Sequence, residues 1–234
     1  MTMHLRAGAS GYSFKEWKGA FYPQKLRPDA MLAYYGERLP TVELNASFYR
    51  LPPAEQFAKW AAAVPDEFCF AVKAPGQITH KAQLRVDAAE LLAQFCTNTA
   101  ALGENCGPLF FQLPPYLKKD APRLRDFLQL LPAGRRAAFE FRHDSWFCDE
   151  VYALLRERGV ALCLSEREDH APPPLVETAG WGYLRLRLKQ YEDADFERWI
   201  ERIAATSWTE VYAYFMHEPT APAYAQQLMD CAKR

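Results

Sequence analysis

The sequence predicts an α/β fold, and within that class a single (β/α)8 barrel over residues 1–234. Three observations lead to this prediction. Strand-like and helix-like runs alternate along the chain, as in parallel α/β proteins. Its 234 residues and 50% hydrophobic composition suffice for one large domain with a sizeable core. No repeat or low-complexity linker divides the chain.

Eight runs have the length and composition of buried strands. They are LRAGAS (5–10), TVELN (41–45), FCFAVK (68–73), PLFFQ (108–112), AAFEFR (137–142), VALCLS (160–165), GYLRLR (182–187) and VYAYF (211–215). A doubly wound open sheet is the main alternative, but no G-x-G-x-x-G opens a helix after a strand. A closed barrel is therefore the preferred interpretation.

Apolar residues at helical spacing separate most of these runs. Prolines precede the first two predicted helices, which is typical of helix starts. The helices are expected at 29–39, 54–64, 84–102, 120–130, 148–158, 193–204 and 221–232. The link after the sixth strand is the exception, because three consecutive prolines at 172–174 discourage a helix. We expect the barrel to be irregular between strands six and seven.

Charge and cysteine content exclude several classes of function. The formal net charge of -1 provides no global attraction to nucleic acid or anionic membrane, so any such attraction has to be local. The six cysteines include no C-x-x-C pair and are expected to be buried reduced thiols, not metal or redox ligands. The absence of a signal peptide or membrane span predicts a cytoplasmic protein with no membrane partner.

Side chains along a strand alternate between its two faces, which separates apolar from polar positions in the predicted barrel. Apolar residues such as Val42, Leu44 and Phe139 suit the outer face beneath the helices. Their neighbours then point to the axis: Glu43, Asn45, Lys73, Gln112, Glu140, Arg142, Ser165, Arg185 and Arg187. Most of these end their strands, where barrel enzymes place their chemistry.

This polar ring has two interpretations. It could be a layer of satisfied ion pairs that only fills the barrel, since buried charges persist when paired and hydrogen-bonded. Alternatively it lines a ligand pocket. Burying an ion costs several kcal/mol, a large burden compared with filling the axis with aliphatic residues. That cost favours a functional pocket.

Several stretches resemble the YecE-like family, number 72 in the series of domains of unknown function. They are GASGYSFKEWKGAFYP (8–23), ELNASFYRLP (43–52), FAVKAPGQITH (70–80), GPLFFQLPP (107–115), EFRHDSW (140–146) and VYAYF (211–215). The resemblance covers nearly the whole chain. It implies a TIM barrel, but the family has no established biochemical activity.

The resemblance also marks individual residues. Family motifs map onto Gly8, Ser10, Gly11, Trp17, Phe21, Tyr22, Glu43, Asn45, Phe48, Tyr49, Lys73, Thr79, His80, Gln112, Glu140, Arg142, His143, Ser145 and Trp146. Two places depart from the family pattern. Arg187 and Leu188 replace the usual His-Gly after strand seven, and Met216 and His217 replace the usual Asn-Asn after strand eight. Both changes alter the rim of the expected pocket.

Glu43 and Glu140 are the best carboxylate pair for catalysis, because two acids in one pocket can acquire different pKa values and divide acid and base roles. Each could instead neutralise an arginine. His80 could act as a general base or phosphate ligand, or it could anchor its loop. His143 with Asp144 could form an acid/base pair or cap the following helix.

Cationic residues around the mouth predict an anionic ligand. Arginine forks suit phosphate and carboxylate oxygens, and barrels often bind phosphate near strands seven and eight. The expected substrate-binding residues are Asn45, Tyr49, Lys73, Gln112, Arg142, His143, Trp146, Arg185 and Arg187. The aromatic residues Tyr12, Trp17, Tyr49 and Trp146 could stack on a base or sugar, although aromatic residues also pack cores.

A divalent metal is the alternative basis for catalysis, since the fold resembles xylose-isomerase-like barrels and TIM-barrel abasic-site endonucleases. The candidate ligands are Glu43, His80, Glu140, Glu166, His217 and Glu218. The nearby Lys and Arg residues would compete electrostatically with a metal, which disfavours a resident ion. No cofactor is assigned.

The residues together predict a barrel enzyme acting on a phosphorylated or otherwise anionic small substrate, by phosphoester hydrolysis or an isomerase or lyase step. Arg142, Arg185, Arg187 and Lys73 would bind the anion, and Glu43, Glu140 and His80 would move protons. One alternative is a nucleic-acid-binding module or a metal-dependent endonuclease-like protein. Another is a non-catalytic interaction protein. The sequence does not indicate an oligomeric state.

Overall fold

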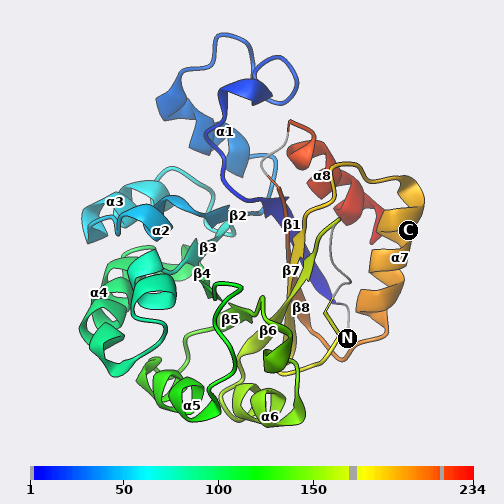
Figure 1. Ribbon diagram of the computed structural model, residues 1–234. Helices are drawn as coiled ribbons and strands as arrows, with labels where there is room; N and C mark the ends of the chain where they lie inside the picture. Colours follow the sequence, from blue (N-terminus) through cyan, green and yellow to red (C-terminus); the bar gives the residue numbers. More distant parts are fainter. Residues whose placement is uncertain (1–2, 169–172, 217–218) are drawn as a thin grey trace.

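Eight parallel strands close into a barrel in which each strand pairs with the next along the chain and β8 pairs with β1 (Figure 1). The structure is a computed structural model that describes residues 3–168, 173–216 and 219–234. The strands are β1 (His4–Ala9), β2 (Thr41–Leu44), β3 (Cys69–Lys73), β4 (Cys106–Gln112), β5 (Ala137–Glu140), β6 (Ala161–Glu166), β7 (Trp181–Leu186) and β8 (Glu210–Phe215). The predicted (β/α)8 barrel is confirmed.

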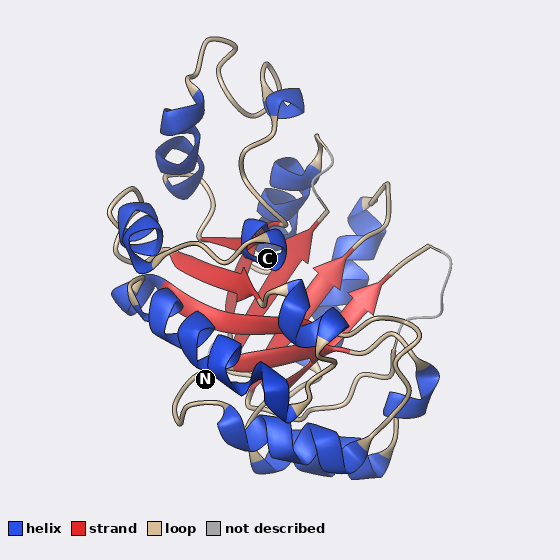
Figure 2. Ribbon diagram, turned by 60° about the vertical axis from the view of Figure 1, so that its left-hand side comes forward, coloured by secondary structure: helices blue, strands red, loops and turns tan. Residues whose placement is uncertain are grey.

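Helices surround the barrel, as Figure 2 shows from the side. The α-helices are α1 (Met31–Gly36), α2 (Ala46–Tyr49), α3 (Ala54–Ala61), α4 (Ala89–Ala100), α5 (Ala121–Leu130), α6 (Asp149–Glu157), α7 (Asp193–Ala204) and α8 (Ala221–Cys231). Local sequence explains their starts: the Asp120 side chain caps α5, and Glu192 with Asp195 forms a capping box at α7. No helix in the described ranges is long and apolar enough to cross a bilayer.

Shorter turns complete the connections. They are the 3-10 turns η1 (Lys15–Trp17), η2 (Pro28–Ala30), η4 (Val86–Ala88), η5 (Gly103–Asn105) and η6 (Asp144–Trp146), and the π-helix η3 (Gln77–Lys81). The segment from η1 to α1 extends beyond the ring of helices, at the top of Figure 1. Between β6 and β7, the described residues 167–168 and 173–180 form no helix, as expected for a link rich in proline.

Alternation along the strands separates two apolar clusters. The outer one joins strand residues such as Val42, Leu44 and Phe139 to the helices. The inner one fills the barrel axis and consists of Cys69, Ala71, Phe110, Ala138, Ala161, Cys163, Trp181, Tyr183, Tyr212 and Tyr214. The predicted strand faces are therefore confirmed. The register also sets Gln112 beside Glu140 and Ser165 beside Arg185, at the C-terminal ends of their strands.

Candidate functional site

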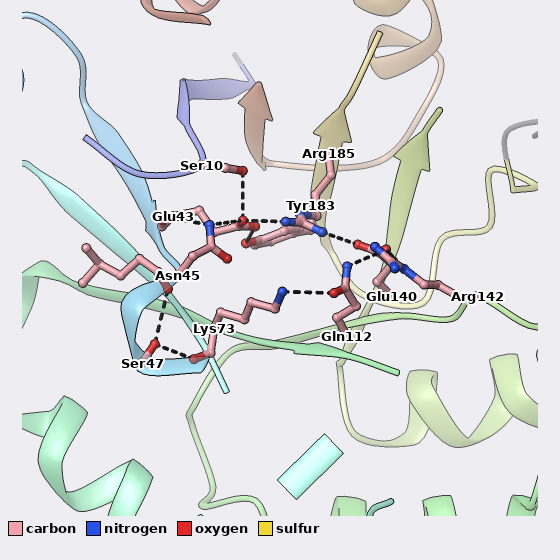
Figure 3. A network of polar contacts seen from close by, with 11 residues as sticks. Ser10, Glu43, Asn45, Ser47, Lys73, Gln112, Glu140, Arg142, Tyr183 and Arg185 are labelled. Atoms are coloured by element: carbon pink, nitrogen blue, oxygen red, sulfur yellow. Dashed lines mark hydrogen bonds and ion pairs between the residues drawn. The ribbon is translucent and has the colours of Figure 1, made fainter. Parts of the chain in front are cut away.

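One arginine joins two buried carboxylates across the C-terminal end of the barrel (Figure 3). Arg185 Nη2 on β7 donates to Glu43 Oε1 on β2 at 2.8 Å, and Arg185 Nη1 donates to Glu140 Oε2 on β5 at 2.6 Å. The side chains are 2%, 0% and 1% exposed, respectively. Because the charges are out of water, the three residues depend on one another for neutralisation.

Neutral donors complete the hydrogen bonding of Glu43. Its Oε1 also accepts from Ser10 Oγ at 2.9 Å and Asn45 Nδ2 at 3.1 Å, and its Oε2 accepts from the Tyr183 hydroxyl at 2.8 Å. Burial alone would raise the pKa of Glu43. Arg185, Lys73 and Arg187 outweigh that effect and lower the pKa. Glu43 is therefore a hydrogen-bonded anion at neutral pH.

Glu140 has a similar environment. Its Oε1 accepts from Gln112 Nε2 and Arg142 Nε, both at 2.8 Å. Burial raises the pKa of this carboxyl, but the surrounding arginines prevail and hold it well below its usual range. The pKa values of Glu43 and Glu140 are thus both lowered. The expected split between a protonated acid and an ionised base is not present.

Aromatic rings support the ion pairs from below. The Arg185 guanidinium lies 4.6 Å from the centroid of Phe110, and this ring stacks on Tyr183 at 5.0 Å with an interplanar angle of 5°. Tyr214 packs against Tyr183 and exchanges a hydrogen bond with Thr41. These side chains fill the axis of the barrel below the polar layer. The polar layer therefore faces the C-terminal mouth and does not line a channel.

Lys73 ends β3 and points into the same layer (Figure 3). Its Nζ donates to Gln112 Oε1 at 3.0 Å and lies 4.4 Å from the centroid of the Phe48 ring. Burial and Arg185 lower the pKa of Lys73 to about 8, although Glu43 and Glu140 oppose the shift. The hydrogen-bond acceptor is a neutral amide, and no carboxylate of the described residues bonds directly to this amine.

Phe48 is held in place on both sides. A Cβ at Gly76 would lie 3.0 Å from the Phe48 ring, so the close approach favours glycine there. The His80 ring meets Phe48 edge-on with centroids 5.0 Å apart. His80 Nδ1 also hydrogen-bonds to Thr79 Oγ1 at 2.9 Å. Burial, Lys73 and Arg142 lower the pKa of His80, so its ring is neutral at pH 7.

A pocket of about 500 Å³ opens above this layer. It is lined by Ser10, Phe14, Asn45, Phe48, Tyr49, Lys73, Gln112, Arg185, Arg187 and Met216. Arg187 has no hydrogen bond or ion pair to any other described residue, and its buried Nε atom is unpartnered. Burial and Arg185 lower the pKa of Arg187. The pocket therefore contains a cationic side chain that is available to a ligand.

Most of the predicted site residues converge here. Glu43, Asn45, Lys73, Gln112, Glu140, Arg142 and Arg185 belong to one hydrogen-bonded network (Figure 3). Arg187 and Tyr49 line the pocket without joining that network, and Tyr49 is 85% exposed. His80 is not among the lining residues; its ring contacts Phe48, which also contacts Lys73.

Two predicted contacts do not line the pocket. Trp146 is 1% exposed, stacks on Phe141 at 4.7 Å and donates from Nε1 to the Leu117 carbonyl at 2.7 Å. His143 accepts a hydrogen bond at Nδ1 from the Ser145 backbone at 3.2 Å and caps η6. Neither Trp146 nor His143 lines this pocket, because both belong to the packing of the turn after β5.

Several contributors were missing from the predicted site: Ser10, Phe14, Phe48 and Met216 line the pocket, and Tyr183 donates to Glu43. Tyr183 lies two residues before Arg185 on the same face of β7, and strand alternation could have identified it. Phe14 lies on the extended segment after β1, where no periodic pattern indicates its direction.

The described ranges contain no group of three or more His, Cys, Asp or Glu residues able to hold a metal ion. Among the candidate ligands, Glu166 accepts from the Tyr191 hydroxyl at 2.7 Å and lies 3.4 Å from Trp199 Nε1. His217 and Glu218 lie outside the described residues.

The chain is similar to known proteins of one family. The family described as "Protein of unknown function DUF72" matches residues 6–234. UPF0759 protein YecE of Escherichia coli (strain K12) is 33% identical over 153 residues, which cover 62% of this chain and only 56% of YecE. UPF0759 protein YunF of Bacillus subtilis (strain 168) is 32% identical over 211 residues, covering 83% of this chain and 73% of YunF.

Solved structures match over almost the full length. A DUF72 family protein from Thermotoga maritima MSB8 has a TM-score of 0.77 at 25% identity, with 97% of each chain covered. A DUF72 family protein from Enterococcus faecalis V583 has a TM-score of 0.83 at 19% identity, covering 98% of this chain and 96% of that one. The second likeness concerns the fold alone.

Proposed function

The chain belongs to the DUF72 family of proteins of unknown function, and from its own site we propose that it is an enzyme for a small phosphorylated or carboxylated substrate. The substrate would bind in the pocket at the C-terminal ends of the strands. One observation carries the proposal: Arg187 lines that pocket without a partner among the described residues, whereas Arg185 and Arg142 are bonded to carboxylates.

The balance of charge supports an anionic ligand. The carboxylates of Glu43 and Glu140 face four cationic side chains, those of Lys73, Arg142, Arg185 and Arg187. A ligand with one or two negative charges would offset this excess and accept the free donors of Arg187. Arg187 directly follows β7, close to where many barrels bind phosphate.

The protonation states favour an isomerase or lyase step over phosphoester hydrolysis. Glu43 and Glu140 are ionised and occupied by Arg185, so they are weak bases that orient the arginine. Lys73 has a pKa of about 8 and can gain or lose a proton near neutral pH.

Anion binding is tested by calorimetric titration with inorganic phosphate and with small carboxylates. Arg187→Gln should weaken binding about 10- to 100-fold, the effect of losing a charge-assisted hydrogen bond of about 1.5–3 kcal/mol. Arg136→Gln, at the opposite end of the barrel, is the matched control and should bind normally. Equal affinities in wild type and Arg187→Gln would contradict the proposal.

The reaction class requires a substrate panel. Phosphatase, nuclease, isomerase and lyase substrates should be tested with and without divalent metal, on wild type and Glu140→Gln. We expect turnover of a phosphorylated or carboxylated carbonyl compound, and loss of turnover in the variant because Arg185 loses one anchor. Unchanged activity in Glu140→Gln would remove Glu140 from the mechanism.

A further inference from the structure

We propose that Lys73 is a nucleophile that forms an imine with the carbonyl carbon of a small oxo acid or carbonyl phosphate. The anionic group of that substrate would lie against Arg187, and this part rests on the proposed function. The inference stands on three features of Lys73: its position in the pocket, its hydrogen-bond acceptor and its charged neighbours.

The amine lies where a substrate could reach it. Lys73 ends β3 at the C-terminal side of the barrel and lines the pocket of about 500 Å³ together with Arg187. Pockets of about 300–1,000 Å³ hold small organic ligands. The ring of Phe48, 4.4 Å from Nζ, covers one side of the amine and leaves the pocket side for the incoming carbonyl.

The acceptor of Lys73 differs from those of the ion-paired lysines. Lys119, Lys189 and Lys233 each pair with a carboxylate, at 2.8, 3.4 and 2.9 Å. Among the described residues, Lys73 donates to the amide oxygen of Gln112 alone, and the nearby carboxylates accept from Arg185. A neutral acceptor orients the amine without holding it in the charged form.

The neighbouring charges favour the free amine. Burial and the positive charges of Arg185 and Arg187 lower the pKa of Lys73 to about 8, against the pull of Glu43 and Glu140. Near neutral pH, Lys73 should therefore carry a free amine in a much larger fraction of molecules than an ordinary lysine, whose pKa is about 10.4. Desolvation and an adjacent cation are two established ways to activate a lysine for imine formation.

The chemistry is balanced without a further reactant. The nitrogen lone pair forms a bond to the carbonyl carbon, and the carbonyl oxygen leaves as water with the two amine protons. The imine nitrogen then takes up one proton. The resulting cation withdraws electrons from the adjacent carbon, so a proton or carboxylate on that carbon is lost more easily. This result agrees with an isomerase or lyase step.

Reductive trapping tests the proposal. The protein is incubated with glyoxylate or with uncharged acetaldehyde in the presence of sodium cyanoborohydride, and the modified peptide is identified by mass spectrometry. We expect modification of Lys73 at least 10-fold faster than that of Lys119, with a rate that rises with pH around a midpoint near 8. Lys73→Arg should abolish it, and Lys119→Arg should not.

The outcomes separate the two proposals. Both proposals predict that glyoxylate traps Lys73 faster than acetaldehyde does. They also predict that the rate of trapping by glyoxylate falls in Arg187→Gln and when phosphate is added. Equal trapping by the two aldehydes at Lys73 would keep the nucleophile and overturn the role of Arg187. Phosphate binding without preferential trapping at Lys73 would overturn the imine and leave anion binding intact. Circular dichroism of Lys73→Arg confirms that a loss of trapping is not a loss of folding.

Discussion

The two ends of the barrel both carry arginines and carboxylates beside a pocket, but they use them differently. At the N-terminal end, Glu210 accepts from Arg6 Nε at 2.9 Å and from Arg136. Arg6 also donates to the Glu67 carbonyl at 2.8 Å, and Arg136 donates to the Tyr212 hydroxyl at 2.8 Å. Both of these arginines are thus occupied by acceptors of the protein itself.

The C-terminal mouth has a similar cavity but a different balance. Its pocket measures about 500 Å³, and the N-terminal one measures about 410 Å³ and includes Asp66, Glu67 and Glu104 in its lining. At the mouth, Arg187 has no partner among the described residues and Lys73 has only a neutral one. The comparison shows that cationic residues beside a cavity are common to both ends. Among the described residues, Arg135 in the N-terminal pocket also has no acidic partner, so the mouth differs in the buried, unpartnered Nε of Arg187 and in the neutral acceptor of Lys73.

The largest expected effect comes from removing the central arginine. Arg185→Met would leave Glu43 and Glu140 buried without compensation, and we expect the free energy of unfolding to fall by about 3–5 kcal/mol. Arg136→Met at the more exposed Glu210 should cost about 1 kcal/mol or less. Urea denaturation of both variants measures this difference. Equal losses would show that the two ends do not differ in burial.

Acid should destabilise the protein because it protonates the carboxylates at the mouth, whose pKa values are lowered in the folded state. A carboxyl whose folded pKa is depressed stabilises the protein above its unfolded pKa, about 4.3 for Glu, and loses that contribution as pH falls toward the folded value. Between pH 5 and 3, wild type should therefore lose about 1–2 kcal/mol more than Glu140→Gln does. Unfolding free energies across this range test it. Asp29→Asn, in an exposed pair with Arg27, should follow the wild-type curve.

Lys73 should lower the stability of the fold where Glu140 raises it, although both groups make stability increase with pH. A lysine whose folded pKa is lowered costs stability below that pKa, and the cost disappears as pH rises from about 8 toward the unfolded value. Wild type should thus become more stable over that interval. Lys73→Met should remove the dependence and raise the free energy of unfolding at pH 7 by about 1–2 kcal/mol. A lower free energy of unfolding in Lys73→Met would mean that the amine of Lys73 contributes to packing in the folded state.

The smallest effect on stability is expected for a substitution at the rim of the pocket. Tyr49 is 85% exposed, so Tyr49→Ala should change the free energy of unfolding by less than about 0.5 kcal/mol. Binding of an aryl phosphate should weaken about 2- to 10-fold through lost ring contact, with inorganic phosphate unaffected. Tyr116→Ala, at a ring that is 64% exposed and does not line the pocket, is the control. Equal effects of the two changes on aryl phosphate binding would contradict a specific role for Tyr49.

The sequence predicted the direction of side chains well on the strands, where the backbone is regular, and poorly on the turns beyond them. Glu43, Glu140 and Arg185 lie on strands, where alternation predicts their direction, and all three face the axis. Trp146 and His80 lie on a 3-10 turn and a π-helix beyond the strand ends. There the chain has no period that relates position to direction, and the structure places Trp146 in the core and the His80 ring against Phe48, outside the lining of the pocket.

The sequence by itself determined the eight strands, their two faces and the polar ends of the inward face, because hydrophobic alternation is a local property of a chain. Only the tertiary structure decided which charges meet. Arg185 reaches Glu43 across 142 positions of sequence, and that contact requires the closed barrel. The same closure assigned the carboxylates to Arg185 and left Arg187 without one among the described residues. Pairing across a barrel depends on distances between side chains, which no local sequence pattern contains. These distances distinguish the residues that support the pocket from the groups available to a ligand.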